Sequence, residues 1–133
     1  MAEYAEVDIA LDTVPFNGGI STLQALWMGV PVVVLAGGSF ASRMGASALH
    51  GAGLSDWVAD SDDDYVRLAT EKAQDRPALL ALKQGLRAHL QTTPAWQIDT
   101  YARDLEAALL NMWQDRCADK TLTRWRKPKS AMV

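Results

Sequence analysis

Three short, mostly apolar segments alternate with amphipathic ones along the first half of the chain. The apolar segments are residues 7–12, 31–36 and 57–59. The second is rich in β-branched residues, as is typical of a parallel strand covered on both faces. Helical spacing follows each of them, at about residues 21–28, 40–50 and 62–74. This alternation predicts an α/β fold with right-handed βαβ units and a parallel sheet of three strands.

The remainder of the chain is predicted to be helical. Pro77 opens a helix to about residue 90, because proline is favoured in the first helical turn. After a break at residues 92–94, apolar residues recur at helical spacing and predict a last helix over about residues 98–117. The apolar stripe of this helix consists of Ile98, Tyr101, Leu105, Leu109, Met112 and Trp113. Residues 1–118 are therefore interpreted as one folded domain.

Composition supports a globular protein and narrows its location. The 133 residues fit one domain, and hydrophobic residues make up 49% of them against 22% charged residues. No apolar run reaches the roughly 20 residues that cross a bilayer, and the acidic start lacks the features of a signal peptide. The single cysteine, Cys117, cannot form an internal disulfide. We expect a cytoplasmic protein with no membrane partner.

Charge is divided unevenly along the chain. Residues 119–133 hold five lysines and arginines and one aspartate, a net charge of +4. Since the whole chain carries −3, residues 1–118 carry −7. An acidic body argues against nucleic acid as a partner. We predict that residues 119–133 form a basic, poorly ordered tail.

Three strands are too few for a complete doubly wound nucleotide fold, which has about six in two halves. The chain is therefore interpreted as half of a Rossmann-like doubly wound parallel sheet with C-terminal helices. The first strand would lie at the point where the strand order reverses, with one edge unpaired. Because an open apolar edge is a template for another chain, we predict self-association. It would occur by strand pairing, by swapping or through the apolar stripe.

A glycine turn joins the first strand to the first helix at residues 17–22, Asn-Gly-Gly-Ile-Ser-Thr. Gly18 and Gly19 allow a tight turn and a close approach of backbone to ligand. The unpaired N–H groups and positive dipole end of the following helix favour a phosphate. The alternative is an ordinary loop in which Ser21 or Thr22 caps the helix. The turn predicts a site for the phosphates of a nucleotide.

Four spaced segments resemble one enzyme family in the same order along the chain. Residues 7–13, 17–33, 40–47 and 53–59 are similar to the O-linked N-acetylglucosamine transferase family. The resemblance extends over roughly residues 5–117. It implies a GT-B glycosyltransferase with two Rossmann-like domains, often preceded in bacteria by tetratricopeptide repeats. This chain would be the C-terminal part of the donor-binding domain.

The resemblance also implies which residues contact the donor, UDP-N-acetylglucosamine. Gly19 stands where a histidine is usual, Ile20 replaces a threonine, and Gln24 takes the ribose-facing position that is acidic in better-known members. Backbone N–H groups survive these changes, so phosphate contact is retained while the donor sugar is left open. The predicted donor-binding residues are Asn17, Gly18, Gly19, Ile20, Ser21, Thr22 and Gln24.

Other candidate chemistry has a structural interpretation. His50 and His89 lie late in helices, where a cation complements the dipole. Residues 62–64, three aspartates, start a helix and compensate its dipole rather than bind a metal. Arg43 could face an anion or form a structural ion pair. No metal or cofactor is predicted. No catalytic residue is predicted either, since the resemblance implies that the family's catalytic histidine and phosphate-contacting lysine belong to upstream segments.

These observations predict a fragment of a glycosyltransferase that moves N-acetylglucosamine from UDP to serine or threonine of an acceptor protein. The fragment would supply the diphosphate-binding loop and be inactive alone. One alternative is a non-catalytic interaction module whose glycine turn is structural. Another is a GT-B enzyme, transferase or epimerase, that uses a different nucleotide sugar.

Overall fold

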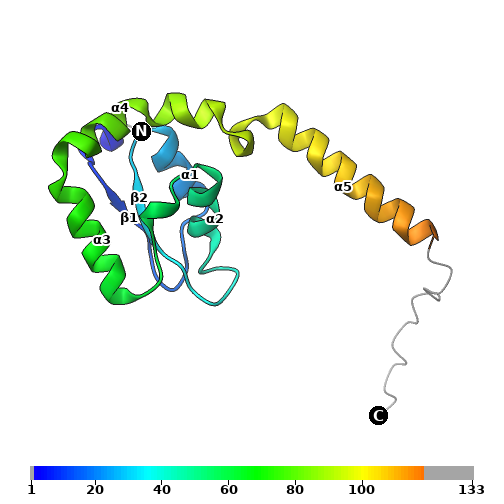
Figure 1. The fold of residues 1–133 in the computed structure, drawn as a ribbon, viewed down its shortest axis with the longest axis horizontal. Coiled ribbons are helices and arrows are strands. Elements are labelled where there is room, and N and C mark those ends of the chain that lie inside the picture. The colour runs from blue at the N-terminus through cyan, green and yellow to red at the C-terminus, as the bar shows by residue number, and fades with distance from the viewer. Residues whose placement is uncertain (1, 119–133) are drawn as a thin grey trace, which may run out of the picture. The chain divides into compact units, whose positions relative to one another are not determined.

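A computed structural model describes residues 2–118 of the chain, so the predicted basic tail at residues 119–133 lies outside the described residues. The chain divides into two compact units, Met1–Ile98 and Asp99–Val133. The first unit holds the sheet and most of the helices (Figure 1). Its strands are β1 (Ala10–Leu11), β2 (Val32–Leu35) and β3 (Val58–Ala59). The helices are α1 (Ile20–Trp27), α2 (Met44–Gly51), α3 (Asp62–Gln74), α4 (Arg76–Thr92) and α5 (Ile98–Ala118). Short 3-10 turns are η1 (Ala2–Glu6), η2 (Ser55–Trp57) and η3 (Pro94–Trp96).

The three strands form a parallel sheet in the order β1-β2-β3, which confirms the predicted topology. Ala10 is in register with Val32, and Val34 with Val58. Within the described part of the chain, β1 pairs with β2 alone and is therefore an edge strand. The side chain of Leu11 at this edge is 60% exposed.

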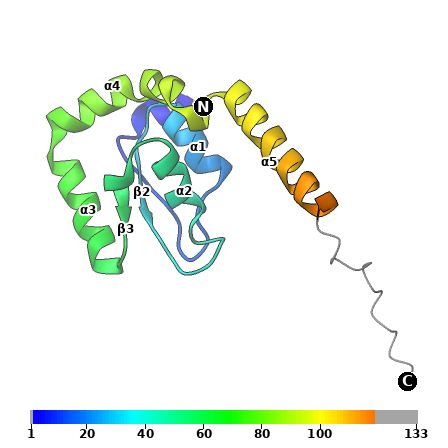
Figure 2. The same cartoon turned by 45° about the vertical axis from the view of Figure 1, so that its right-hand side comes forward.

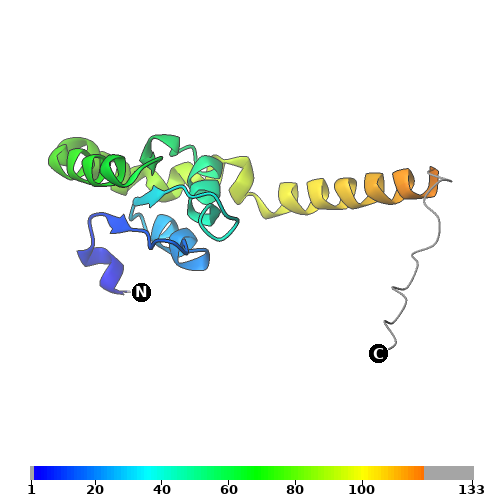
Figure 3. The ribbon, with the colours of Figure 1, turned by 90° about the horizontal axis from the view of Figure 1, so that it is seen from below.

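Helices cover both faces of the sheet. α3 lies on one side of β2, and α1 and α2 lie on the other (Figures 1 and 2). Figure 3 shows β2 between α3 and α1 when the layers are seen from below. α4 packs against both α1 and α3 and closes one end of the layers. Residues from every layer form a single core, with Leu26, Val33, Val34, Leu49, Leu86 and Leu90 fully buried.

Two predicted boundaries were wrong. β1 starts at Ala10 rather than residue 7, because the carbonyl of Val7 accepts a hydrogen bond from Lys83 Nζ at 2.8 Å and not from a strand. The second helix starts at Met44 rather than residue 40. Ahead of it, Gly37 N donates to the Ser42 carbonyl at 2.8 Å and closes a loop that a helix would break.

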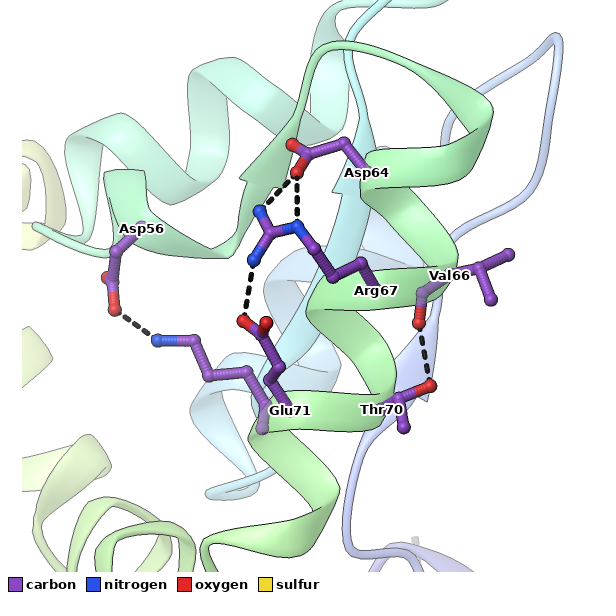
Figure 4. A network of polar contacts seen from close by, with 7 residues as sticks. Asp56, Asp64, Val66, Arg67, Thr70 and Glu71 are labelled. Atoms are coloured by element: carbon purple, nitrogen blue, oxygen red, sulfur yellow. Dashed lines mark hydrogen bonds and ion pairs between the residues drawn. The ribbon is translucent and has the colours of Figure 1, made fainter.

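The predicted helix starts in α3 and α4 are confirmed. Ser61 caps α3, accepting a hydrogen bond from Asp64 N at 3.2 Å, and proline occupies the first turn of α4. The surface of α3 carries an ion-pair network (Figure 4). In it Arg67 joins Asp64 to Glu71, and its guanidinium lowers the pKa of the Asp64 carboxyl. The two Arg67 ion pairs lie within one helix and stabilise it.

The second unit begins at Asp99 and contains all of α5 except its first residue, Ile98. No described residue of α5 is buried, and the whole apolar stripe predicted from the sequence is exposed. No helix among the described residues is long and apolar enough to span a bilayer.

Candidate functional site

The candidate site begins where the chain leaves β1. Asp12 follows the strand, and its Oδ1 accepts hydrogen bonds from Thr13 N at 2.9 Å and Gly18 N at 2.7 Å. This carboxylate therefore spans the loop and joins the end of the strand to the glycine turn. The loop between them includes a cis peptide bond at Val14-Pro15.

Gly18 occupies a position that no other residue fits without rearrangement. A Cβ atom there would lie 2.5 Å from Thr22 Oγ1, 2.6 Å from Ser21 Oγ and 3.0 Å from Asp12 Oδ1. Thr22 is buried, and its hydroxyl donates to the Gly18 carbonyl at 3.0 Å. The turn is thus closed against the first turn of α1, with side-chain oxygens packed around a bare Cα.

The start of α1 has no side-chain cap. Gly19 is the residue before the helix, and neither Ser21 nor Thr22 accepts a hydrogen bond from the first amides, so the capped-loop interpretation was wrong. Among the described residues, no acceptor pairs with the amides of Gly19, Ile20 or Ser21. The Ile20 side chain is 74% exposed. Unpaired amides at a positive helix end form an arrangement that binds anionic oxygens.

Asn17 has a different place from the rest of the turn. Its side chain is 1% exposed, and Nδ2 donates to the carbonyls of Thr13 at 3.1 Å and Leu35 at 3.4 Å. The backbone N–H of Asn17 donates to the Ala41 carbonyl at 3.0 Å. Asn17 therefore ties the turn to the loop that follows β2, and its side chain lies inside the protein rather than at the surface.

The remaining predicted residues lie on the surface of α1. Ser21 and Gln24 are both exposed, and no hydrogen bond within the described residues occupies their side chains. Gln24 lies about one helical turn after Ile20, and thus after the free amides. Ser21 and Gln24 are therefore open to a ligand, whereas Asn17 and Thr22 hold the turn in place.

An open apolar groove adjoins the turn, with a volume of about 440 Å³. Gly19, Ile20 and Leu23 line one wall, α2 forms another, and Trp96 closes the end. Met44 at the start of α2 lies so close to Gly19 that a Cβ atom there would be 2.8 Å from Met44 Cε. The surface next to the free amides is thus polar on the backbone side and apolar on the groove side.

The turn combines free amides, which attract an anion, with the carboxyl group of Asp12, which repels one when it is ionised. Burial raises the pKa of the Asp12 carboxyl above its ordinary value, and the hydrogen bonds from Gly18 and Thr13 oppose that shift only in part. Asp12 Oδ2 is buried and has no hydrogen-bond partner within residues 2–118. A carboxylate therefore lies directly behind the amides that would receive an anion. Asp12 is absent from the residues predicted for the site, although an acidic residue at the carboxyl end of a strand is a visible signal in the sequence.

The other candidate residues have structural partners. His50 Nδ1 shares a hydrogen bond with Ser55 Oγ at 2.8 Å, and His89 Nε2 donates to the Ala52 carbonyl at 2.9 Å. Arg43 donates to the Gly37 carbonyl at 3.2 Å. No group of three or more acidic, histidine or cysteine side chains in residues 2–118 is arranged to hold a metal.

Comparison with known proteins identifies the family. The sequence model of glycosyl transferase family 41 matches residues 4–105. The chain belongs to this family. A probable UDP-N-acetylglucosamine-peptide N-acetylglucosaminyltransferase SPINDLY of Oryza sativa subsp. japonica is 40% identical over 117 residues, which are 88% of this chain and 13% of the relative. The corresponding transferase of Caenorhabditis elegans is 29% identical over 107 residues, 80% of this chain and 9% of that protein.

A solved structure of another protein has the same fold as this glycosyl transferase family 41 chain. A mutant O-GlcNAc transferase of Thermobaculum terrenum superposes with a TM-score of 0.80 at 38% identity, over 88% of this chain and 22% of the other. The predicted half of a Rossmann-like sheet from a GT-B enzyme is thereby confirmed. The chain spans about an eighth of the plant relative's length.

Proposed function

We propose that this chain supplies the turn that holds the diphosphate of a nucleotide sugar in a protein O-glycosyltransferase. The observation that carries the proposal is the set of unpaired amides of Gly19, Ile20 and Ser21 at the start of α1. These amides and the helix dipole attract phosphate oxygens without any basic side chain. The relatives' names identify UDP-N-acetylglucosamine as the donor and a peptide as the acceptor.

Each residue of the turn has a role in this proposal. Gly18 and Asn17 fix the backbone, and the exposed hydroxyl of Ser21 adds a donor for a phosphate oxygen. Gln24 reaches the ribose hydroxyls. The whole enzyme transfers N-acetylglucosamine to serine or threonine hydroxyls, with its acid–base chemistry supplied by other segments. The two histidines of this chain are occupied by structural partners, so the chain alone transfers no sugar.

Calorimetric titration of the 133-residue chain with UDP tests the proposal. Ser21→Asp places a carboxylate among the free amides, so we expect UDP binding to be lost through charge repulsion and occupation of the amides. Thr70→Asp adds the same charge on the exposed surface of α3 and should leave the affinity unchanged. Equal affinities of the two variants would refute the proposed site.

A different nucleotide is the second candidate donor. Gly19 and Ile20 replace side chains that the family resemblance associates with the diphosphate, so the turn relies on backbone contacts that every nucleoside diphosphate offers equally. Titrations with GDP beside UDP decide between them. A chain that binds neither nucleotide would instead be an interaction module with a structural turn, which the internal hydrogen bond from Gly18 N to Asp12 also permits.

We also propose that the isolated chain self-associates. β1 has an unpaired edge within the described residues, with Leu11 exposed beside it. The apolar stripe of α5 is a second surface, exposed among the residues that the structure describes. Either surface would bury apolar area by pairing with a second copy.

A further inference from the structure

We propose that Asp12 is a positioning residue for the donor diphosphate: its Oδ1 holds the Gly18 amide and so fixes the peptide groups of Gly19 and Ile20. This inference rests on the proposed function of the turn. It assigns the acidic residue behind the amides a role in their geometry, although its own charge opposes the anion.

Asp12 can act in this way because its backbone is anchored on two sides. Asp12 N donates to the Val33 carbonyl of the central strand region at 2.9 Å. The hydroxyl of Tyr65 from α3 donates to the Asp12 carbonyl at 2.8 Å. The backbone N–H of Asp12 is thus bound to β2, and its carbonyl is bound to α3. The carboxylate extends from this anchored backbone towards the turn.

Gly18, the donor in this hydrogen bond, is also held by two contacts. Gly18 N is held by Asp12 Oδ1 at 2.7 Å, and the Gly18 carbonyl is held by Thr22 Oγ1 at 3.0 Å. The two peptide groups that flank Gly18 therefore each have one fixed partner. A glycine without such partners samples many conformations. Removing the Asp12 contact frees the peptide group just ahead of the amides that would bind phosphate.

One side of the Asp12 carboxylate packs against Gly45 of α2. Gly45 lies so close to Asp12 Oδ2 that a Cβ atom on Gly45 would be 2.3 Å from it. Oδ2 is buried, and no described residue forms a hydrogen bond with it. The hydrogen bonds of this side chain are therefore made by Oδ1, which accepts from Thr13 N and from Gly18 N of the turn. Asparagine keeps such an acceptor oxygen.

Two substitutions separate the acceptor from the charge. Asp12→Ala removes the acceptor, and we expect UDP to bind about tenfold more weakly and the Gly18 amide to exchange with solvent about tenfold faster. Asp12→Asn keeps an acceptor oxygen and removes the negative charge behind the site. It should bind UDP at least as tightly as the wild type, with slow Gly18 exchange. Asp8→Ala, at the other end of the same segment, is the matched control and should change neither quantity.

The measurements are calorimetric titration with UDP and amide exchange of the free protein by NMR, on the 133-residue chain. Weakened binding in Asp12→Ala together with rescue in Asp12→Asn supports the inference. Unchanged affinity and exchange in a folded Asp12→Ala would overturn it while the proposed function stands. If Asp12→Ala does not fold, loss of UDP binding in a folded Asp12→Asn overturns it as well. Wild-type protein that binds neither UDP nor GDP removes the proposed function, and the inference with it.

Discussion

The indole rings of Trp27 and Trp96 stack with their centroids 6.0 Å apart and their planes 6° from parallel. The Arg87 guanidinium lies over the Trp27 ring, 4.6 Å from its centroid. These contacts join α1, α4 and η3. Because Trp96 also lines the groove beside Gly19, the stack holds one wall of the candidate site in place.

Removal of this stack should destabilise the first unit. We expect Trp96→Ala to lower the free energy of unfolding by about 1–2 kcal/mol, from the lost ring contact and lost apolar burial. Trp113→Ala removes the same side chain from α5, where it is 66% exposed, and should change the free energy by less than about 0.5 kcal/mol. Urea unfolding followed by circular dichroism measures both. Equal losses in the two variants would contradict the role of the stack.

The glycines of the two strand-ending loops should differ sharply in tolerance. Gly18→Ala places a Cβ atom against the Thr22 and Ser21 hydroxyls, so we expect the turn to shift and UDP binding to fall by at least about tenfold. Gly38→Ala meets no atom within 4 Å and should bind UDP as the wild type does. Calorimetry on both variants gives the comparison. A Gly18→Ala variant that binds normally would show that the tight closure of the turn is not required.

Much of the fold follows from local sequence signals. The three aspartates at residues 62–64 and the proline of α4 mark helix starts that depend only on neighbouring residues, and both helices begin there. The run at 31–36 is apolar on both faces and became the central strand. One of the two boundaries that failed depends on a distant partner. At β1, Lys83 donates a hydrogen bond to the Val7 carbonyl from 76 residues away, and no local pattern indicates this contact.

The site was predictable as a segment but not in the role of each side chain. Two glycines between a strand and a helix indicate a turn with free amides, and Gly19, Ile20 and Ser21 have them. The inward position of Asn17 depends on the Leu35 carbonyl, 18 residues away, and could not be inferred from the turn. Asp12 precedes the predicted motif, and its contact with Gly18 bridges a loop whose path the sequence leaves open.

Asp12 should also give the protein a distinctive pH dependence. Burial raises the pKa of its carboxyl above the ordinary value of 3.8. Its favourable contribution to stability is therefore complete below the unfolded value and is lost as pH rises through the folded value. The pKa of Tyr65, the titratable side chain that contacts Asp12 from α3, is raised by burial, so Tyr65 stays neutral in this range.

Thermal unfolding from about pH 3 to pH 7 tests this dependence. The melting temperature of Asp12→Asn should rise relative to wild type as pH increases. Asp8→Asn should behave in the opposite way, because Lys83 lowers the pKa of the Asp8 carboxyl and that contribution is present only above the unfolded value. Parallel curves for wild type and Asp12→Asn would show that Asp12 titrates as in the unfolded chain.

Self-association should disappear when a lysine is introduced into the apolar surface that binds the second copy, either the β1 edge or the α5 stripe. A lysine at an edge strand blocks strand pairing, and a lysine in an apolar helix stripe blocks helix pairing. We expect wild-type chain to exceed the mass of a monomer in light scattering at high micromolar concentration. Leu11→Lys tests the β1 edge, and Leu109→Lys tests the α5 stripe; the variant that restores the monomer mass identifies the surface in contact. Phe40→Lys charges an even more exposed apolar side chain outside both surfaces and should leave the mass unchanged. A monomeric wild-type chain would mean that neither the open strand edge nor the stripe is sufficient to bind a second copy.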